Sequence, residues 1–88
     1  MLKIKIFRND GKEFPDSFPE SLRKYILSEL AIEGVQLTPK KKGELELSIA
    51  GLLPQMSLFS VLTWVEACVG DVASHYGIWS VTDWKVLG

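Results

Sequence analysis

The chain has 88 residues, of which 47% are hydrophobic and 24% charged, a composition typical of one small globular domain spanning residues 1–88. Ten Lys and Arg against eleven Asp and Glu give a formal net charge of −1, so composition provides no strongly basic surface for a phosphate backbone. The single cysteine excludes an intramolecular disulfide, and the N-terminus lacks the pattern of a signal peptide, so we expect a cytoplasmic protein.

The first segment, residues 2–7, alternates apolar and basic side chains. Leu2, Ile4 and Ile6 share one face, and the lysines at positions 3 and 5 share the other. Alternation with a period of two is typical of a strand with one buried face, so we expect the chain to begin with such a strand.

A first helix is predicted to begin near Phe18. Ser17 and Glu20 have the spacing of a capping box, in which the two side chains satisfy backbone N–H groups at the start of a helix. Apolar side chains then recur every four residues from Leu22, which indicates one buried helical face. Gly34 is the natural stop for this helix.

Residues 35–49 alternate on both sides of a turn that Pro39 and Gly43 bracket. Apolar and polar residues alternate over 35–38 and again over 44–49. Alternation on both sides of such a turn predicts a β-hairpin. Its tip carries three consecutive basic residues, Lys40, Lys41 and Lys42.

A second helix is predicted from Met56 or Ser57 to Tyr76. Its core stripe has the three-and-four spacing of a buried helical face and consists of Leu58, Val61, Leu62, Val65, Val69, Val72 and Tyr76. Residues 47–65 carry no charge over 19 positions, about the length of a membrane span. Interruption by Gly51 and Pro54, and a change from alternation to helical period, argue against a membrane span.

The last segment, residues 78–87, is rich in β-branched and aromatic residues and is predicted to be a strand. Its apolar phase slips, because Trp79 and Val81 share one face while Trp84 shares the other with residue 86. A bulge at positions 82 and 83 is the simplest arrangement that restores the phase.

The predicted order of elements is strand, helix, strand, strand, helix, strand, which gives an α+β fold: a two-layer ferredoxin-like βαββαβ sandwich. In that arrangement the first and third strands are neighbours, so Lys3 and Lys5 are expected beside Glu44 and Glu46, a favourable cross-strand pairing. The alternative is a three-stranded βαβαβ sheet with two helices on one face.

No residue set has the spacing of a catalytic, metal or cofactor site. Cys68, Asp71 and His75 fall on one side of the second helix, but Cys68 and His75 are about 10 Å apart along its axis, beyond hydrogen-bond reach. One His and one Cys do not supply the ligands of a zinc site, and glycine-rich phosphate loops are absent from the sequence. We therefore expect no enzyme activity, no cofactor and no metal.

Charge is unevenly distributed along the sequence. Residues 1–46 hold seventeen charged side chains, and residues 47–88 hold four together with all three tryptophans. Exposed aromatic and apolar surface is typical of protein interfaces, although three tryptophans in a domain of this size can also all lie in the core. Under the interface hypothesis, the anchors are Trp64, Trp79 and Trp84.

From this distribution we expect a non-catalytic protein–protein interaction or regulatory module that uses the second helix and the last strand. Its partner is another protein or a second copy in a homodimer, not a membrane. Phage and mobile-element accessory proteins, including inhibitors, are often domains of this size and class, an analogy at the level of the fold. The alternative is a nucleic-acid-binding module that uses Lys40, Lys41 and Lys42.

Overall fold

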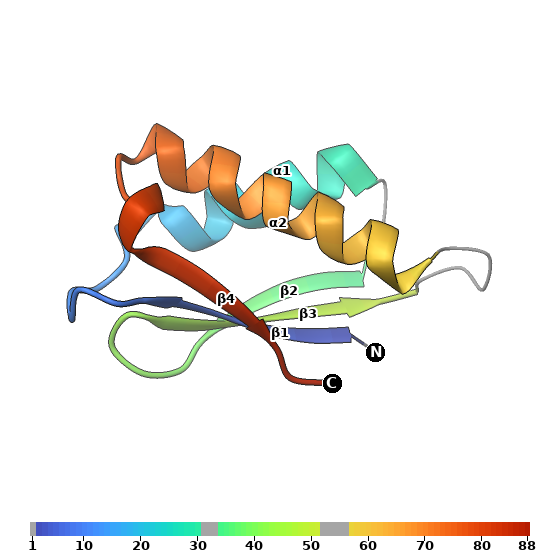
Figure 1. Ribbon diagram of the computed structural model, residues 1–88, viewed down its shortest axis with the longest axis horizontal. Coiled ribbons are helices and arrows are strands. Elements are labelled where there is room, and N and C mark those ends of the chain that lie inside the picture. Colours follow the sequence, from blue (N-terminus) through green and yellow to red (C-terminus); the bar gives the residue numbers. More distant parts are fainter. Residues whose placement is uncertain (1, 31–33, 52–56) are drawn as a thin grey trace.

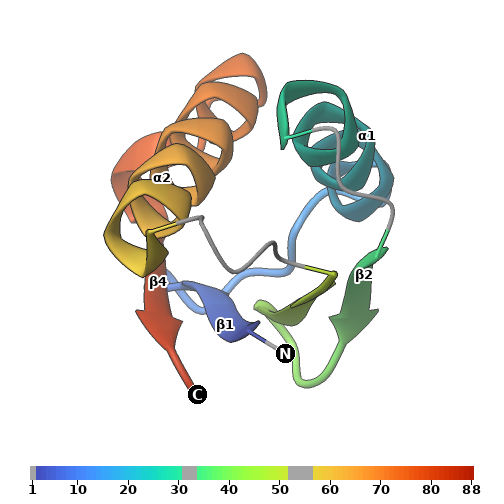
Figure 2. The ribbon, with the colours of Figure 1, turned by 90° about the vertical axis from the view of Figure 1, so that its right-hand side faces the viewer.

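The computed structural model describes residues 2–30, 34–51 and 57–88. In chain order these ranges form β1 (Leu2–Arg8), α1 (Phe18–Leu30), β2 (Gly34–Pro39), β3 (Glu44–Ala50), α2 (Leu58–His75), the short 3₁₀ helix η1 (Trp79–Val81) and β4 (Thr82–Val86). The strands make one antiparallel sheet in the order β2-β3-β1-β4, and both helices cover the same face of it (Figure 1; Figure 2). The predicted ferredoxin-like βαββαβ arrangement is therefore confirmed.

The core lies between the sheet and the helices because the strands turn their apolar side chains to that side. The register of the two central strands sets Ile4 of β1 opposite Leu47 of β3, and both are fully buried. The helices contribute one stripe each, which includes Phe18, Leu22, Ile26, Val61, Val65, Val69 and Val72. No helix in the described ranges is long and apolar enough to cross a membrane.

The predicted hairpin is present, so the three-stranded alternative is wrong. β2 pairs with β3 along its whole length. At the tip Gly43 has a φ of 70°, and a Cβ at this position would lie 2.6 Å from the carbonyl oxygen of Lys12. Glycine therefore allows the tip to pack directly on the loop that follows β1.

The predicted charge pairing between the central strands is confirmed for one glutamate. Lys5 lies opposite Glu46, whose carboxylate is also 3.9 Å from the Lys3 ammonium and 3.0 Å from that of Lys40. The hydrogen bond from Lys40 is the largest cause that lowers the pKa of Glu46. Glu44 lies opposite an aromatic residue instead, so the second predicted pairing is wrong.

The phase slip before β4 has a different cause from the predicted bulge. Residues 79–81 form η1, and the Thr82 hydroxyl donates a 2.8 Å hydrogen bond to the carbonyl of Ile78, which closes this turn. β4 then pairs with β1 in unbroken register. A helical turn before the strand, not an extra residue within it, changes the face on which apolar residues fall, so Trp79 is exposed while Trp84 packs on the core.

Other local predictions also need correction. Gly34, predicted to stop the first helix, is the first residue of β2, where a Cβ would lie 2.8 Å from the carbonyl oxygen of Ala50. The Ser17 hydroxyl, predicted to cap α1, lies 2.7 Å from the Tyr76 hydroxyl and joins the start of α1 to the end of α2. Leu58, predicted in the core stripe, is 55% exposed. The predicted helix start at Met56 lies outside the described residues.

Candidate functional site

The three predicted tryptophan anchors lie in three different places. Trp64 is 54% exposed and lies beside Tyr25 in the groove between α1 and α2. Trp79 is 64% exposed and lies in η1, after the turn that follows the C-terminal end of α2. Trp84 is half-buried on β4 and packs against the core. No single compact patch contains all three.

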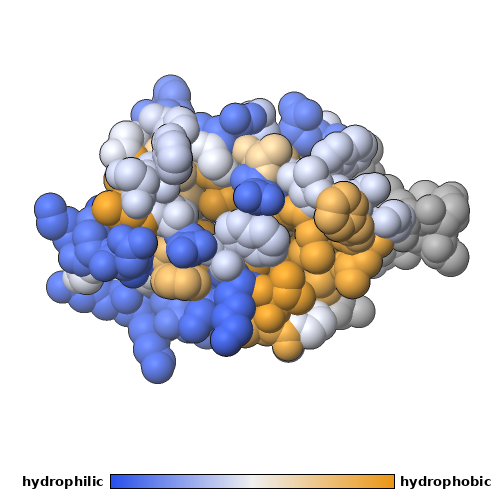
Figure 3. Space-filling view, in the orientation of Figure 1, coloured by the Kyte–Doolittle hydropathy of each residue, from blue (hydrophilic) through white to orange (hydrophobic). Residues whose placement is uncertain are grey.

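A hydrophobic surface lies on the side of α2 that faces away from α1. Asp71 and Trp64 lie toward α1, so Phe59 and Leu62, on the other side of the helical wheel, face away from α1. Figure 3 shows this hydrophobic area over the first half of α2 and the end of β4. Phe59 is its most exposed member, at 79%. We call this surface the α2–β4 flank and define it by Leu58, Phe59, Leu62, Val86 and Leu87.

The groove between the helices contains the predicted series of Cys68, Asp71 and His75. Asp71 accepts a 2.7 Å hydrogen bond from the Tyr25 hydroxyl, which is the main reason that the pKa of Tyr25 is raised to about 12. Cys68 is buried, and burial raises the pKa of its thiol to about 11, while His75 is exposed. The thiol is therefore protonated at neutral pH, and the carboxylate beside it already accepts a hydrogen bond from a phenol, so the three side chains do not form an activated nucleophile.

The same groove is closed at one end by a hydroxyl cluster. The Tyr76 hydroxyl lies 2.7 Å from that of Ser17 and 2.9 Å from that of Ser21, and these hydrogen bonds, the one with Ser17 first, lower the pKa of Tyr76. The Phe18 ring packs edge-on against the Tyr76 ring, with centroids 5.6 Å apart. These contacts hold the end of α2 on the start of α1, so the cluster serves the packing of the two helices.

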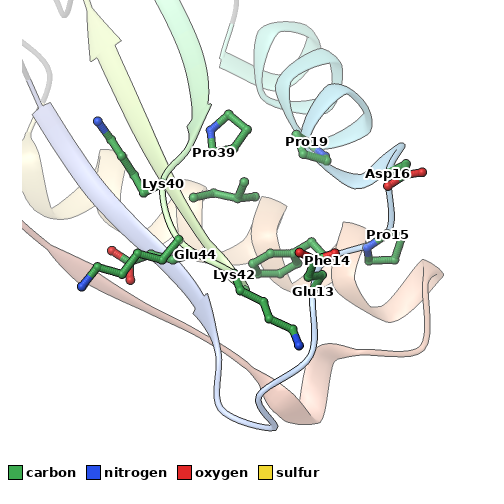
Figure 4. Close-up of a pocket in the computed structure, with 12 residues that line it drawn as sticks. Glu13, Phe14, Pro15, Asp16, Pro19, Pro39, Lys40, Lys42 and Glu44 are labelled. Atoms are coloured by element: carbon green, nitrogen blue, oxygen red, sulfur yellow. The ribbon is translucent and has the colours of Figure 1, made fainter.

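The hairpin tip lines a hollow of about 370 Å³ together with the loop after β1 (Figure 4). Lys40 and Lys42 extend from the tip in different directions, so their charges do not converge on one point. The lining also contains acidic side chains, namely Glu13, Asp16 and Glu44. These carboxylates offset the positive potential that would attract a phosphate backbone. Nucleic-acid binding by Lys40, Lys41 and Lys42 therefore stays a prediction.

The described ranges hold no group of three or more His, Cys, Asp or Glu side chains placed to bind a metal ion. No protein-family model matches the chain, and neither a curated protein nor a solved structure does. The α2–β4 flank holds four of the six large hydrophobic side chains that are exposed in the described residues, so it is the surface on which we base a functional proposal.

Proposed function

We propose that the protein is a non-catalytic interaction module that associates with a protein through the α2–β4 flank. The observation that carries this proposal is the exposure of large apolar side chains on this flank, above all Phe59, which is 79% exposed. Monomeric domains rarely expose large hydrophobic side chains in clusters, and such clusters mark interaction surfaces. Occupying the partner's surface would give the module a steric or regulatory effect, as in an accessory or inhibitory protein.

The size of the expected effect follows from the exposure of Phe59. Complete burial of a Phe side chain is worth about 1.5–3 kcal/mol, and most of that gain is still available at this position. A partner that buries the ring would therefore gain about 2 kcal/mol, which corresponds to roughly 30-fold in Kd. The single cysteine, buried and without a disulfide, suits a cytoplasmic setting for the module.

Replacing Phe59 by Glu tests the proposal, because an exposed position accepts the substitution without loss of the fold. Ser28→Glu, which adds the same charge at an exposed position on α1, is the matched control. We expect Phe59→Glu to weaken association about 30-fold or more, and Ser28→Glu to leave it unchanged, both in light scattering over a concentration series and in titration of any isolated partner. Equal association by both variants and the wild-type chain would contradict the proposal.

A further inference from the structure

β4 is an edge strand, and its charges are arranged so that two antiparallel copies of it would attract each other. Among the described strands it pairs with β1 alone, at the end of the sheet order. Its five residues, Thr82–Val86, place an acidic residue before Trp84 and a basic residue after it. If a second β4 ran antiparallel beside the first with the two Trp84 residues opposite each other, Asp83 of each copy would face Lys85 of the other. Two opposite-charge pairs would form at once.

The backbone of β4 offers the hydrogen bonds that this pairing needs. Leu87 donates to the carbonyl of Lys3, and Asn9 donates to the carbonyl of Val81, so alternate residues of the strand face β1. The residues between them, namely Thr82, Trp84 and Val86, direct their N–H and C=O groups to the free edge. The Thr82 N–H is already used by the carbonyl of Trp79. Four intermolecular hydrogen bonds remain. In each copy the N–H of Trp84 donates one of them and the N–H of Val86 donates another.

Other symmetric registers are less favourable. Centring the pair on residue 83 sets two aspartates opposite each other, and centring it on residue 85 does the same with two lysines. Centring it on residue 82 or 86 leaves the charges without an opposite partner and pairs only part of the strand. Like charges directly opposite each other are destabilising, so the register about Trp84 is the one that pairs all five residues and both charges.

The other edge strand of the sheet, β2, has fewer free backbone groups with which to pair a further strand. The carbonyl of Val35 in β2 accepts a 3.2 Å hydrogen bond from Nε of Arg23, and Pro39, the last residue of this strand, has no N–H. Both features hinder the addition of a strand at β2. Self-pairing at β4 would therefore close after two copies, without a second edge that extends the assembly.

We propose that the partner is a second copy of this chain, joined by antiparallel pairing of β4 with β4 about Trp84, which covers the β4 end of the flank at Val86. This inference rests on the proposed function and names its partner. The two copies form an eight-stranded sheet, four strands from each, and a two-fold axis perpendicular to the sheet keeps both α2 helices on the same face. The α2 helices then run antiparallel on that face, and their C-terminal halves lie nearest the two-fold axis, because β4 begins below the C-terminal end of α2 (Figure 1).

Pairing requires one local exchange at Asp83. In the single chain its carboxylate accepts a 2.9 Å hydrogen bond from the N–H of Trp84 and so covers one donor on the free edge. In the dimer that N–H donates to the carbonyl of Trp84 in the second copy, and the freed carboxylate pairs with the second copy's Lys85. Each group that loses a partner thereby gains another.

Charge reversal tests the register. Asp83→Lys and Lys85→Asp each place like charges opposite one another at both pairs, so we expect each variant alone to dimerise about tenfold or more weakly than the wild-type chain. Mixed in equal amounts, the two variants carry complementary charges and form a heterodimer of near wild-type affinity, measured by light scattering with one chain enlarged by a tag. Two variants that dimerise as well alone as together would overturn the register.

Cysteine cross-linking provides a second measurement. The register sets Thr82 of one copy opposite Val86 of the other, so Thr82→Cys combined with Val86→Cys is expected to give a disulfide-linked dimer on a non-reducing gel. Within one chain these positions are about 13 Å apart, too far for a disulfide. The native Cys68 is buried and does not compete. Efficient linking by Val86→Cys alone, or no linking by the pair, would overturn the proposed register.

The two proposals fail in different ways. A chain that stays monomeric up to millimolar concentration, but binds another protein in a Phe59-dependent way, overturns self-pairing and leaves the interaction module standing. A dimer that follows the charge-reversal pattern but is indifferent to Phe59→Glu supports pairing through β4 and removes the flank from it.

Discussion

Replacing Leu58 by Ala tests whether this side chain belongs to the exposed flank or to the core. Leu47, fully buried at the centre of β3, is the matched position of the same residue type. Truncating a buried Leu to Ala removes transfer free energy and leaves a cavity, so Leu47→Ala should lower the free energy of unfolding by about 3 kcal/mol. Water already reaches more than half of the Leu58 side chain, which is 55% exposed, so Leu58→Ala should cost less than about 1 kcal/mol.

Urea unfolding followed by circular dichroism measures both values, and thermal unfolding gives an independent check. For a domain of this size, 1 kcal/mol corresponds to a shift in Tm of about 4–8 °C. Leu58→Ala should therefore shift Tm by less than about 8 °C, while association through the flank becomes weaker. A loss of 2 kcal/mol or more at Leu58 would refute the reasoning, because this side chain would then belong to the core and not to a docking surface.

Three further predictions concern a buried position, Cys68, and a close-packed one, Gly43. Because its pKa is about 11, the native Cys68 thiol should react with a disulfide reagent at pH 8 at least about 100-fold more slowly than in the unfolded chain. Between pH 9 and 11 the folded state keeps the thiol proton while the unfolded state loses it, so the free energy of unfolding should fall as pH rises. Cys68→Ala should remove this contribution. An unchanged slope of stability against pH in that variant would contradict the raised pKa of Cys68. Gly43→Ala should destabilise by about 1–2 kcal/mol from its positive φ, plus the contact with Lys12. Gly11 has a similar φ, but a Cβ added there would have no heavy atom within 4 Å. An equal loss of stability in Gly11→Ala and Gly43→Ala, measured by urea unfolding, would therefore count against the close contact at Gly43.

The fold was predictable from sequence because its signals are local periods. Alternation over residues 2–7 and on both sides of the tip fixes which strand faces meet the helices, and these are the faces that the structure buries. The core stripe of α2 was recognisable from its spacing at Val61, Val65 and Val72. Once two central strands and two amphipathic helices are identified, the order of the sheet follows from the short hairpin connection.

Features that depend on the extent of a neighbouring element were not predictable. A helical stripe gives the direction of the core but not how far the sheet extends below the helix, so Leu58 was assigned to the core although the first turn of α2 is largely uncovered. A phase slip can be absorbed by a bulge or by a helical turn, and the sequence of β4 alone does not distinguish them. The exposure of Trp79 follows from that turn, and for this reason the pattern did not place it.

The charges on β4 can act both for and against association. Charged side chains on an edge strand usually discourage pairing, because most approaching strands leave them without partners. Asp83 and Lys85 have this effect for an unrelated strand and for the symmetric registers centred on residues 83 and 85. An antiparallel copy centred on Trp84 turns the same two charges into attraction, so one pattern would reject wrong partners and select one geometry. In the proposed dimer the carboxylate of Asp83 would strengthen this discrimination, because it covers the Trp84 N–H in the single chain and would leave it only for a strand with a lysine at the matching position.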